Sequence, residues 1–187
     1  RFGDFDVSTF VGGNVMRYEY ESMIQTGQTQ VIPGLQDITN YSSIETEHAL
    51  VRKAVRSLFG QVSLGYKEFA YLDATFRNDV SSTLSPKNRS YFYPSVTASV
   101  LLSEAFGWRS KAVNYLKIRG GWSQVGADAN PYQLATVFTS ETAFNGNPLQ
   151  SSSTIGMNPN LKPEKTSSIE AGFEAAFWDN RLYLDFT

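Results

Sequence analysis

The sequence contains no cysteine and only one histidine. Without cysteine the chain has neither a disulfide framework nor a thiolate metal site. His48 lies in the stretch ETEHALV, and the chain carries no complete nucleophile motif that a histidine base could serve. We therefore expect that the protein is not an enzyme and has no catalytic residue, no metal site and no cofactor.

A charge excess and long apolar runs are also missing. The 16 Lys and Arg residues nearly balance the 18 Asp and Glu residues and are scattered, so no nucleic-acid partner is expected. No run approaches the ~20 apolar residues of a membrane-spanning helix, and the N-terminal RFGDFDVST lacks the apolar region of a secretory signal. A membrane-spanning strand needs only ~9–11 residues of alternating pattern, so a membrane barrel remains open.

Aromatic residues and strand patterns, by contrast, are abundant. Phe, Tyr and Trp make up 14% of the chain, which suits strands. Apolar and polar residues alternate along two segments joined at Lys67 and Glu68. The apolar set is Leu58, Val62, Leu64, Leu72, Ala74 and Phe76. Similar alternation in 93–102, 115–123 and 169–177 predicts an all-β, antiparallel fold.

Short and long connections alternate along the chain. Lys67 and Glu68 form one short turn and WDNR forms another, whereas 78–90, 124–133 and 138–165 are long. Short turns at one end and long loops at the other are typical of a transmembrane β-barrel. Residues 25–53 and 139–165 are the predicted extracellular loops. One or two helical turns are predicted in 43–53, because Ser42 and Glu45 have capping-box spacing.

Aromatic residues gather near the predicted strand ends, as in the interfacial girdles of membrane barrels. They are Tyr18, Tyr20, Tyr66, Phe69, Tyr71, Tyr91, Phe92, Tyr93, Phe177 and Trp178. The same pattern also suits a soluble β-sandwich that binds carbohydrate or protein, with its apolar faces packed together. A further alternative is a self-contained outer-membrane barrel of about eight strands.

Four blocks of sequence carry a family resemblance. RNDVSS at 77–82 resembles R-x-D-G-S-S, and YFYPSVTASVLLSEAF at 91–106 resembles an F-P-S strand followed by an I-S-E-x-F turn. LKIRGGWSQVGADANPY at 116–132 resembles L-K-L-R-x-S-Y-G-x-T-G-N, and NPNLKPEK at 158–165 resembles an N-P-x-L-x-P-E strand entry. In this order the blocks resemble the C-terminal part of the barrel of SusC/RagA-like TonB-linked outer-membrane receptors of Bacteroidota. Val80 stands where Gly is usual, and Gly121 and Trp122 stand where Ser and Tyr are typical.

The resemblance implies a fold and a set of partners. Residues 1–187 would be part of one transmembrane β-barrel domain, an antiparallel wall segment of a large TonB-dependent receptor whose plug domain and remaining strands lie outside the sequence. Such receptors reside in the bacterial outer membrane and import oligosaccharides or peptides with a SusD-like surface lipoprotein. The implied partners are outer-membrane lipid, that lipoprotein, TonB through the plug, and the substrate.

Polar side chains of the wall and loops are the candidate functional residues. We expect a polar lumen wall that includes Asp73, Arg77, Lys117, Arg119, Glu170 and Glu174. The candidate substrate-binding residues are Arg77, Asp79, Asn88, Asp128 and Asn130. The carboxylate side chains on these strands are better explained as part of a hydrated lumen wall than as the paired acids of a glycosidase.

Overall fold

Strands make up most of the regular structure in the residues that this computed structural model describes, which are 3–108, 110 and 112–187. The strands are β1 (Phe5–Gln30), β2 (Tyr41–Tyr66), β3 (Ala70–Ser81), β4 (Ser90–Leu101), β5 (Val113–Ala127), β6 (Phe138–Phe144), β7 (Asn147–Ser152), β8 (Glu164–Phe177) and β9 (Leu182–Phe186). Two helical turns, η1 (Ile38–Asn40) and α1 (Leu102–Ala105), complete the regular elements. Among the described residues, neither helical turn has the length or the apolar character of a membrane-spanning helix. The predicted all-β class is confirmed.

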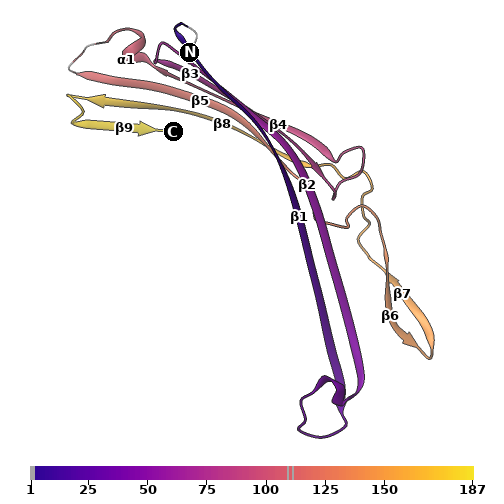
Figure 1. Cartoon of the computed structure of the whole chain (residues 1–187). Coiled ribbons are helices and arrows are strands. Elements are labelled where there is room, and N and C mark those ends of the chain that lie inside the picture. Colours follow the sequence, from indigo (N-terminus) through magenta and orange to yellow (C-terminus); the bar gives the residue numbers. More distant parts are fainter. Residues whose placement is uncertain (1–2, 109, 111) are drawn as a thin grey trace.

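The main sheet is one open layer. Its order is β1-β2-β3-β4-β5-β8-β9 with antiparallel neighbours, and β6 and β7 form a separate two-stranded sheet. Figure 1 shows the main sheet as a curved layer, with the β6–β7 hairpin beyond the ends of β5 and β8. Within the described residues no second sheet packs on it, and β1 and β9 lie at opposite edges. Neither the soluble sandwich nor the small closed barrel therefore describes these strands.

The register confirms the predicted alternation of the two faces. Leu64 pairs with Leu72, whereas the next residues along each strand, Ser63 and Asp73, pair on the opposite side. One side, the apolar face, carries exposed side chains that include Val7, Val11, Val15, Leu58, Val62, Leu72, Val96, Ile118, Trp122, Ile169 and Phe173. Val11 and Ile169 are 70% and 82% exposed, so nothing in the described chain covers this face. The other side, the polar face, carries all six residues predicted for the lumen wall.

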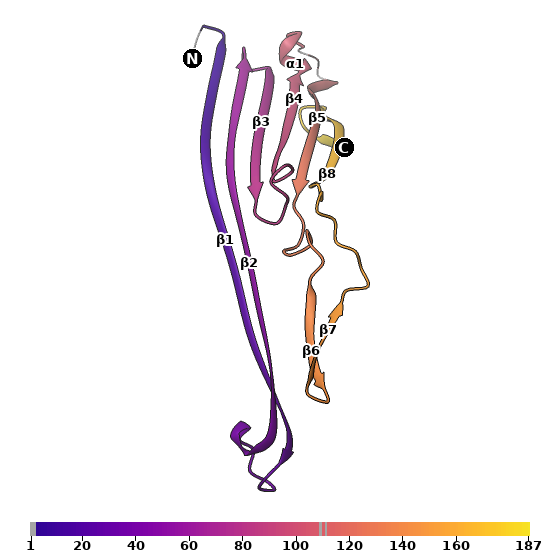
Figure 2. The ribbon, with the colours of Figure 1, turned by 90° about the vertical axis from the view of Figure 1, so that its right-hand side faces the viewer.

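The β1–β2 hairpin has two parts. Residues 5–16 and 55–66 belong to the wall, because β2 pairs with β3 only from Val55 onwards. Residues 17–30 and 41–54 continue as a two-stranded ribbon that projects far beyond the sheet (Figure 2). We call this projection the ribbon.

The ribbon corrects the expected loop at 25–53 and its helical turns. Only residues 31–40 lie between the strands, and 41–53 are strand throughout. The helix prediction is wrong because cross-strand pairing with β1 overrides the local capping signal. Asn40, which is 7% exposed, organises the tip: its side-chain amide donates to the carbonyls of Ile32 and Leu35 at 2.8 Å each. Within 139–165 the chain forms the β6–β7 hairpin and then runs without a strand to β8. That both segments are extracellular stays a prediction.

The short connections lie at one end of the sheet. Lys67 and Glu68 have φ values of 47° and 61°, as a tight turn between β2 and β3 requires. The β8–β9 turn contains three consecutive residues with positive φ, Trp178, Asp179 and Asn180. Figure 2 shows the ribbon and the β6–β7 hairpin extending from the opposite end. The predicted asymmetry of connection lengths is confirmed except between β4 and β5, where a longer connection that contains α1 lies at the same end as the short turns (Figure 2).

Candidate functional site

A charged cluster lies on the polar face where the ribbon leaves the wall. Asp79 is only 6% exposed and accepts hydrogen bonds from the guanidinium of Arg77 at 2.9 Å and from the hydroxyl of Tyr93 at 2.6 Å. Arg77 also donates to the Ser57 hydroxyl at 2.9 Å, and its guanidinium lies 5.5 Å from the ring centre of Phe59. Three neighbouring strands thus hold the Arg77 head in place.

Asp128 follows the last residue of β5 and joins the same region. Its carboxylate forms an ion pair with the Lys53 ammonium at 2.6 Å and accepts hydrogen bonds from the hydroxyls of Ser81 and Thr83. Burial acts to raise the pKa of Asp128, but the hydrogen bonds from Lys53 and Ser81 outweigh it and leave the pKa below its ordinary value. Asp128 therefore stays ionised at neutral pH.

Together these side chains surround a hollow on the polar face. Its volume is ≈ 230 Å³, and Arg77, Asp79 and Asp128 line it together with Lys53 and Tyr91. The structure thus brings three of the five candidate residues to one place. Lys53 and Tyr91 were not among the candidates.

The other two candidates lie on loops. The Asn88 side chain donates to the backbone carbonyls of Asn160 and Leu161 at 3.0 and 3.1 Å, which ties the β3–β4 loop to the segment before β8. Asn130 is exposed in the loop after β5. Asn88 therefore holds two loops together, whereas Asn130 faces solvent.

Two side chains fasten the ribbon where β3 stops pairing with it. The Tyr132 hydroxyl accepts from the backbone N–H of Arg52 at 3.0 Å and donates to the carbonyl of Leu50 at 3.3 Å. The Ser82 hydroxyl accepts from the N–H of Ala54 at 2.9 Å. These bonds satisfy backbone groups of an edge strand that would otherwise be unpaired.

A second charged cluster lies on the polar face near β9. Glu174 accepts hydrogen bonds from Lys117 at 3.1 Å, Arg119 at 2.6 Å and the Tyr183 hydroxyl at 2.9 Å. Arg119 also pairs with Asp185 at 2.7 Å. The wall charges predicted at 117, 119 and 174 are thus a connected network, in which each charge has an opposite neighbour.

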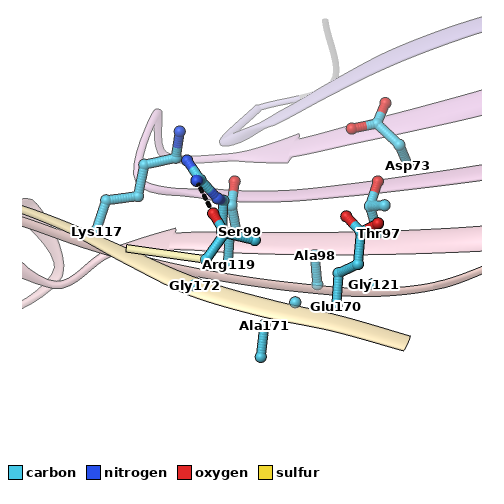
Figure 3. Close-up of a pocket in the computed structure, with 12 residues that line it drawn as sticks. Asp73, Thr97, Ala98, Ser99, Lys117, Arg119, Gly121, Glu170, Ala171 and Gly172 are labelled. Carbon is cyan, nitrogen blue, oxygen red and sulfur yellow. Dashed lines mark hydrogen bonds between the residues drawn. The ribbon is translucent and has the colours of Figure 1, made fainter. Parts of the chain in front are cut away.

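Beside this network the sheet is hollowed by ≈ 240 Å³. Small residues line its base: Gly121 and Gly172 lie on the polar face, whereas Ala98, Gly120 and Ala171 belong to the apolar face and contribute backbone. Figure 3 shows Asp73, Thr97 and Glu170 at one end and Lys117 and Arg119 at the other. Opposite charges at the two ends suit a polar, hydrogen-bonding ligand.

The acidic side chains of the polar face are held by neighbouring side chains. No group of three or more His, Cys, Asp or Glu side chains that could hold a metal ion occurs among the described residues. The Asp79 and Asp128 carboxylates are each engaged by a cation and a hydroxyl. The side chains of the polar face can bind a ligand through hydrogen bonds and electrostatic attraction.

Tyr91 and Tyr93 correct part of the aromatic prediction. Both pair across from polar-face residues, Asp79 and Arg77, and their rings stack with centres 6.0 Å apart. They are therefore not part of a girdle on the apolar face, unlike Tyr66 and Phe92, which share that face. Ser95 and Thr97 lie on the same face of β4 as the two tyrosines, so the alternation in the sequence already indicated that both tyrosines belong to the polar face.

Comparison with known proteins agrees with this architecture. The family model described as "TonB dependent receptor-like, beta-barrel" matches residues 2–187. The "TonB-dependent receptor P26" of Formosa agariphila is 32% identical over 136 residues, covering 70% of this chain and 14% of that protein. The "TonB-dependent receptor P3" of the same organism is 31% identical over 134 residues, covering 70% of this chain and 13% of that protein.

Solved structures show the same fold. The RagAB peptide importer in the "closed-closed" state superposes with a TM-score of 0.84 at 24% identity, over 97% of this chain and 21% of that chain. The "open-open" state gives a TM-score of 0.78. This chain thus spans a small part of the length of the proteins that it resembles. With the family model matched over nearly all residues, the chain belongs to the TonB-dependent receptor-like β-barrel family.

Proposed function

We propose that this chain is a wall segment of an outer-membrane importer, with the apolar face toward lipid and the polar face toward a hydrated lumen. The exposed apolar face of a single-layer sheet is the observation that carries the proposal. On β1 this face runs from Phe5 to Val15, roughly 33 Å along a strand, and a tilt of about 40° reduces that to about 25 Å. Such a height matches the apolar band of outer-membrane barrels.

The full-length protein would take up oligosaccharides or peptides with a SusD-like lipoprotein, driven by TonB through a plug domain. Support comes from the family and from the likeness in fold to the RagAB peptide importer. The two hollows of the polar face, with hydroxyls and charges around small residues, suit substrates of either chemistry. No covalent step is required of this segment.

Among the five candidate residues we assign two roles. Arg77, whose side chain is 38% exposed, and the exposed Asn130 would contact substrate directly. Asp79, Asp128 and Asn88 are hydrogen-bonded within the protein and would hold the wall and loops in position.

Uptake by the full-length receptor in its bacterial host tests the proposal. A strain that lacks the receptor, or lacks TonB, should fail to accumulate a labelled oligosaccharide or peptide that the parent strain takes up. Arg77→Ala should reduce uptake about tenfold if one charge-assisted contact is lost. Arg181→Ala, at an exposed turn on the other end of the sheet, is the matched control. Normal uptake without the receptor would contradict the proposal.

A further inference from the structure

The apolar face ends in cations on the side of the ribbon. Along β1, Val7, Val11 and Val15 are followed on the same face by Arg17. Along β2, Leu58 is followed on that face by Arg56. Both guanidinium groups therefore lie directly beyond the end of the apolar face, on the side that would meet lipid.

Arg17 and Arg56 are close neighbours. Val15 pairs with Arg56 and Arg17 pairs with Ala54, so the two arginines are diagonal neighbours on one face of the hairpin. Diagonal positions of this kind have Cα atoms about 7–8 Å apart, within reach of two long side chains. Both residues are exposed.

Neither arginine has an ion-pair or hydrogen-bond partner for its side chain among the residues that the structure describes. Side chains farther along the same face of the ribbon do have partners: Arg52 forms an ion pair with Glu19 at 2.9 Å, and His48 Nε2 lies 2.9 Å from the Glu21 carboxylate. Arg56 is flanked by strands on both sides, where its neighbours are Val15 and Val80. Two like charges placed side by side repel unless an anion lies between them.

We propose that Arg17 and Arg56 bind the phosphorylated headgroup of an outer-leaflet lipid whose acyl chains lie along the apolar face. Arginine presents a planar fork of donors that matches phosphate oxygens, and two forks can hold one phosphate from both sides. The acyl chains have a ready surface in Val11, Val15 and Leu58, which are 70%, 60% and 54% exposed. The inference rests on the proposed membrane location, with the ribbon on the predicted extracellular side, and is independent of what the receptor transports.

Lipid binding to the full-length receptor provides the test. Native mass spectrometry of the detergent-purified receptor, titrated with lipid A, measures the fraction of receptor that carries lipid. Arg17→Gln combined with Arg56→Gln should weaken binding about tenfold or more, because charge-assisted contacts are lost. Arg17→Lys combined with Arg56→Lys keeps the charge but loses the planar fork of donors. The affinity of this variant for lipid A should therefore lie between that of the unaltered receptor and that of the Gln double variant.

The control removes two cations elsewhere. Lys87→Gln combined with Arg89→Gln changes an exposed loop by the same charge and should bind lipid A as the unaltered receptor does. Retained heat-resistant migration on a gel would show that each variant is still a folded barrel. Weak binding of dephosphorylated lipid A to every variant, and no competition by millimolar inorganic phosphate, would support a lipid headgroup site.

Three results would overturn the inference. These are equal lipid A affinity of the unaltered receptor and the Gln double variant, equal affinity for the dephosphorylated lipid, and displacement of lipid A by inorganic phosphate. A receptor that fails to form a heat-resistant barrel in membranes would instead contradict the proposed membrane location.

Discussion

The wall and the ribbon share the strands β1 and β2, yet their side chains follow different rules. In the wall one face is apolar and the other polar, as Leu64 with Leu72 and Ser63 with Asp73 illustrate. In the ribbon the continuation of the apolar face carries ion pairs such as Glu19 with Arg52. This change of pattern is what the proposed membrane location predicts, because the wall would lie between lipid and water whereas the ribbon would have water on both sides.

The two regions also differ in what stabilises them. Each inner wall strand has hydrogen-bonded neighbours on both sides, whereas the ribbon has only two strands, an arrangement of marginal stability in water. The ribbon is instead fastened at its foot, where Tyr132 and the pair of Lys53 and Asp128 hold β2. Its tip is held by the buried Asn40. The stability of the wall should therefore depend most on the polarity of its side chains, whereas the stability of the ribbon should depend on individual contacts.

The largest effect is expected for a charge on the apolar face of the wall. Val62 faces outward near the middle of this face, so Val62→Arg should destabilise the full-length barrel by about 2–4 kcal/mol in lipid vesicles. Gln61→Arg, one residue away on the polar face, should cost less than about 1 kcal/mol. Denaturant titration of the vesicle-inserted receptor measures both. Equal costs would remove the distinction between the two faces.

A smaller effect is expected where strands crowd a glycine. A Cβ at Gly60 would lie 2.6 Å from the Phe76 ring and 2.9 Å from the Phe10 carbonyl oxygen. Gly60→Ala should therefore destabilise the barrel by about 1–3 kcal/mol through overpacking. At Gly120 the nearest atom would be 3.7 Å away, an ordinary contact, so Gly120→Ala serves as the control and should change stability by less than about 1 kcal/mol. If both substitutions behave alike, close packing at Gly60 does not limit the wall.

The alternation of apolar and polar residues along the strands predicts much of the wall. Residues two apart share a face, so the apolar and polar sets and the turn at Lys67 and Glu68 follow from the sequence. The same rule places Tyr91 and Tyr93 on the polar face, although their aromatic character suggested a girdle. Face assignment by alternation was the stronger guide, since it depends on backbone geometry rather than on residue type.

The ribbon and the charged cluster were harder to predict. Residues 41–53 carry a helical capping signal, and only their pairing with β1 makes them strand. Lys53 and Asp128 are separated by 75 positions, and their contact depends on how β2, β3 and the loop after β5 come together. Local patterns contain no information about such long-range contacts, so Lys53 was missed.

The foot of the ribbon should respond to pH through Asp128. Because its pKa in the folded protein lies below the ordinary value of 3.8, the contact with Lys53 is fully present above that value and is lost as the pH falls through the lowered pKa. Hydrogen exchange of the Arg52 amide, corrected for intrinsic rates, should show constant protection from about pH 5 to 8 and a loss below about pH 4.

A neutral substitution sharpens this prediction. Asp128→Asn should reduce Arg52 protection by about 1–2 kcal/mol at neutral pH and abolish its dependence on acid pH, because a charge-assisted contact is lost. Asp6→Asn, in the wall at the other end of β1, is the control. Unchanged protection in the Asp128 variant would mean that Tyr132 alone fastens the ribbon.

The smallest effect is expected for a single ion pair of the ribbon. Glu19 and Arg52 are 58% and 62% exposed, so water and salt screen their attraction. Glu19→Gln should therefore change hydrogen exchange of the ribbon by less than about 0.5 kcal/mol, and 1 M salt should remove even that difference. If the double variant, Glu19→Gln with Arg52→Gln, regains the protection that Glu19→Gln loses, the ion pair itself is the cause. A cost as large as that of Val62→Arg would show instead that charge pairing, and not fastening at the foot and tip, keeps the ribbon ordered.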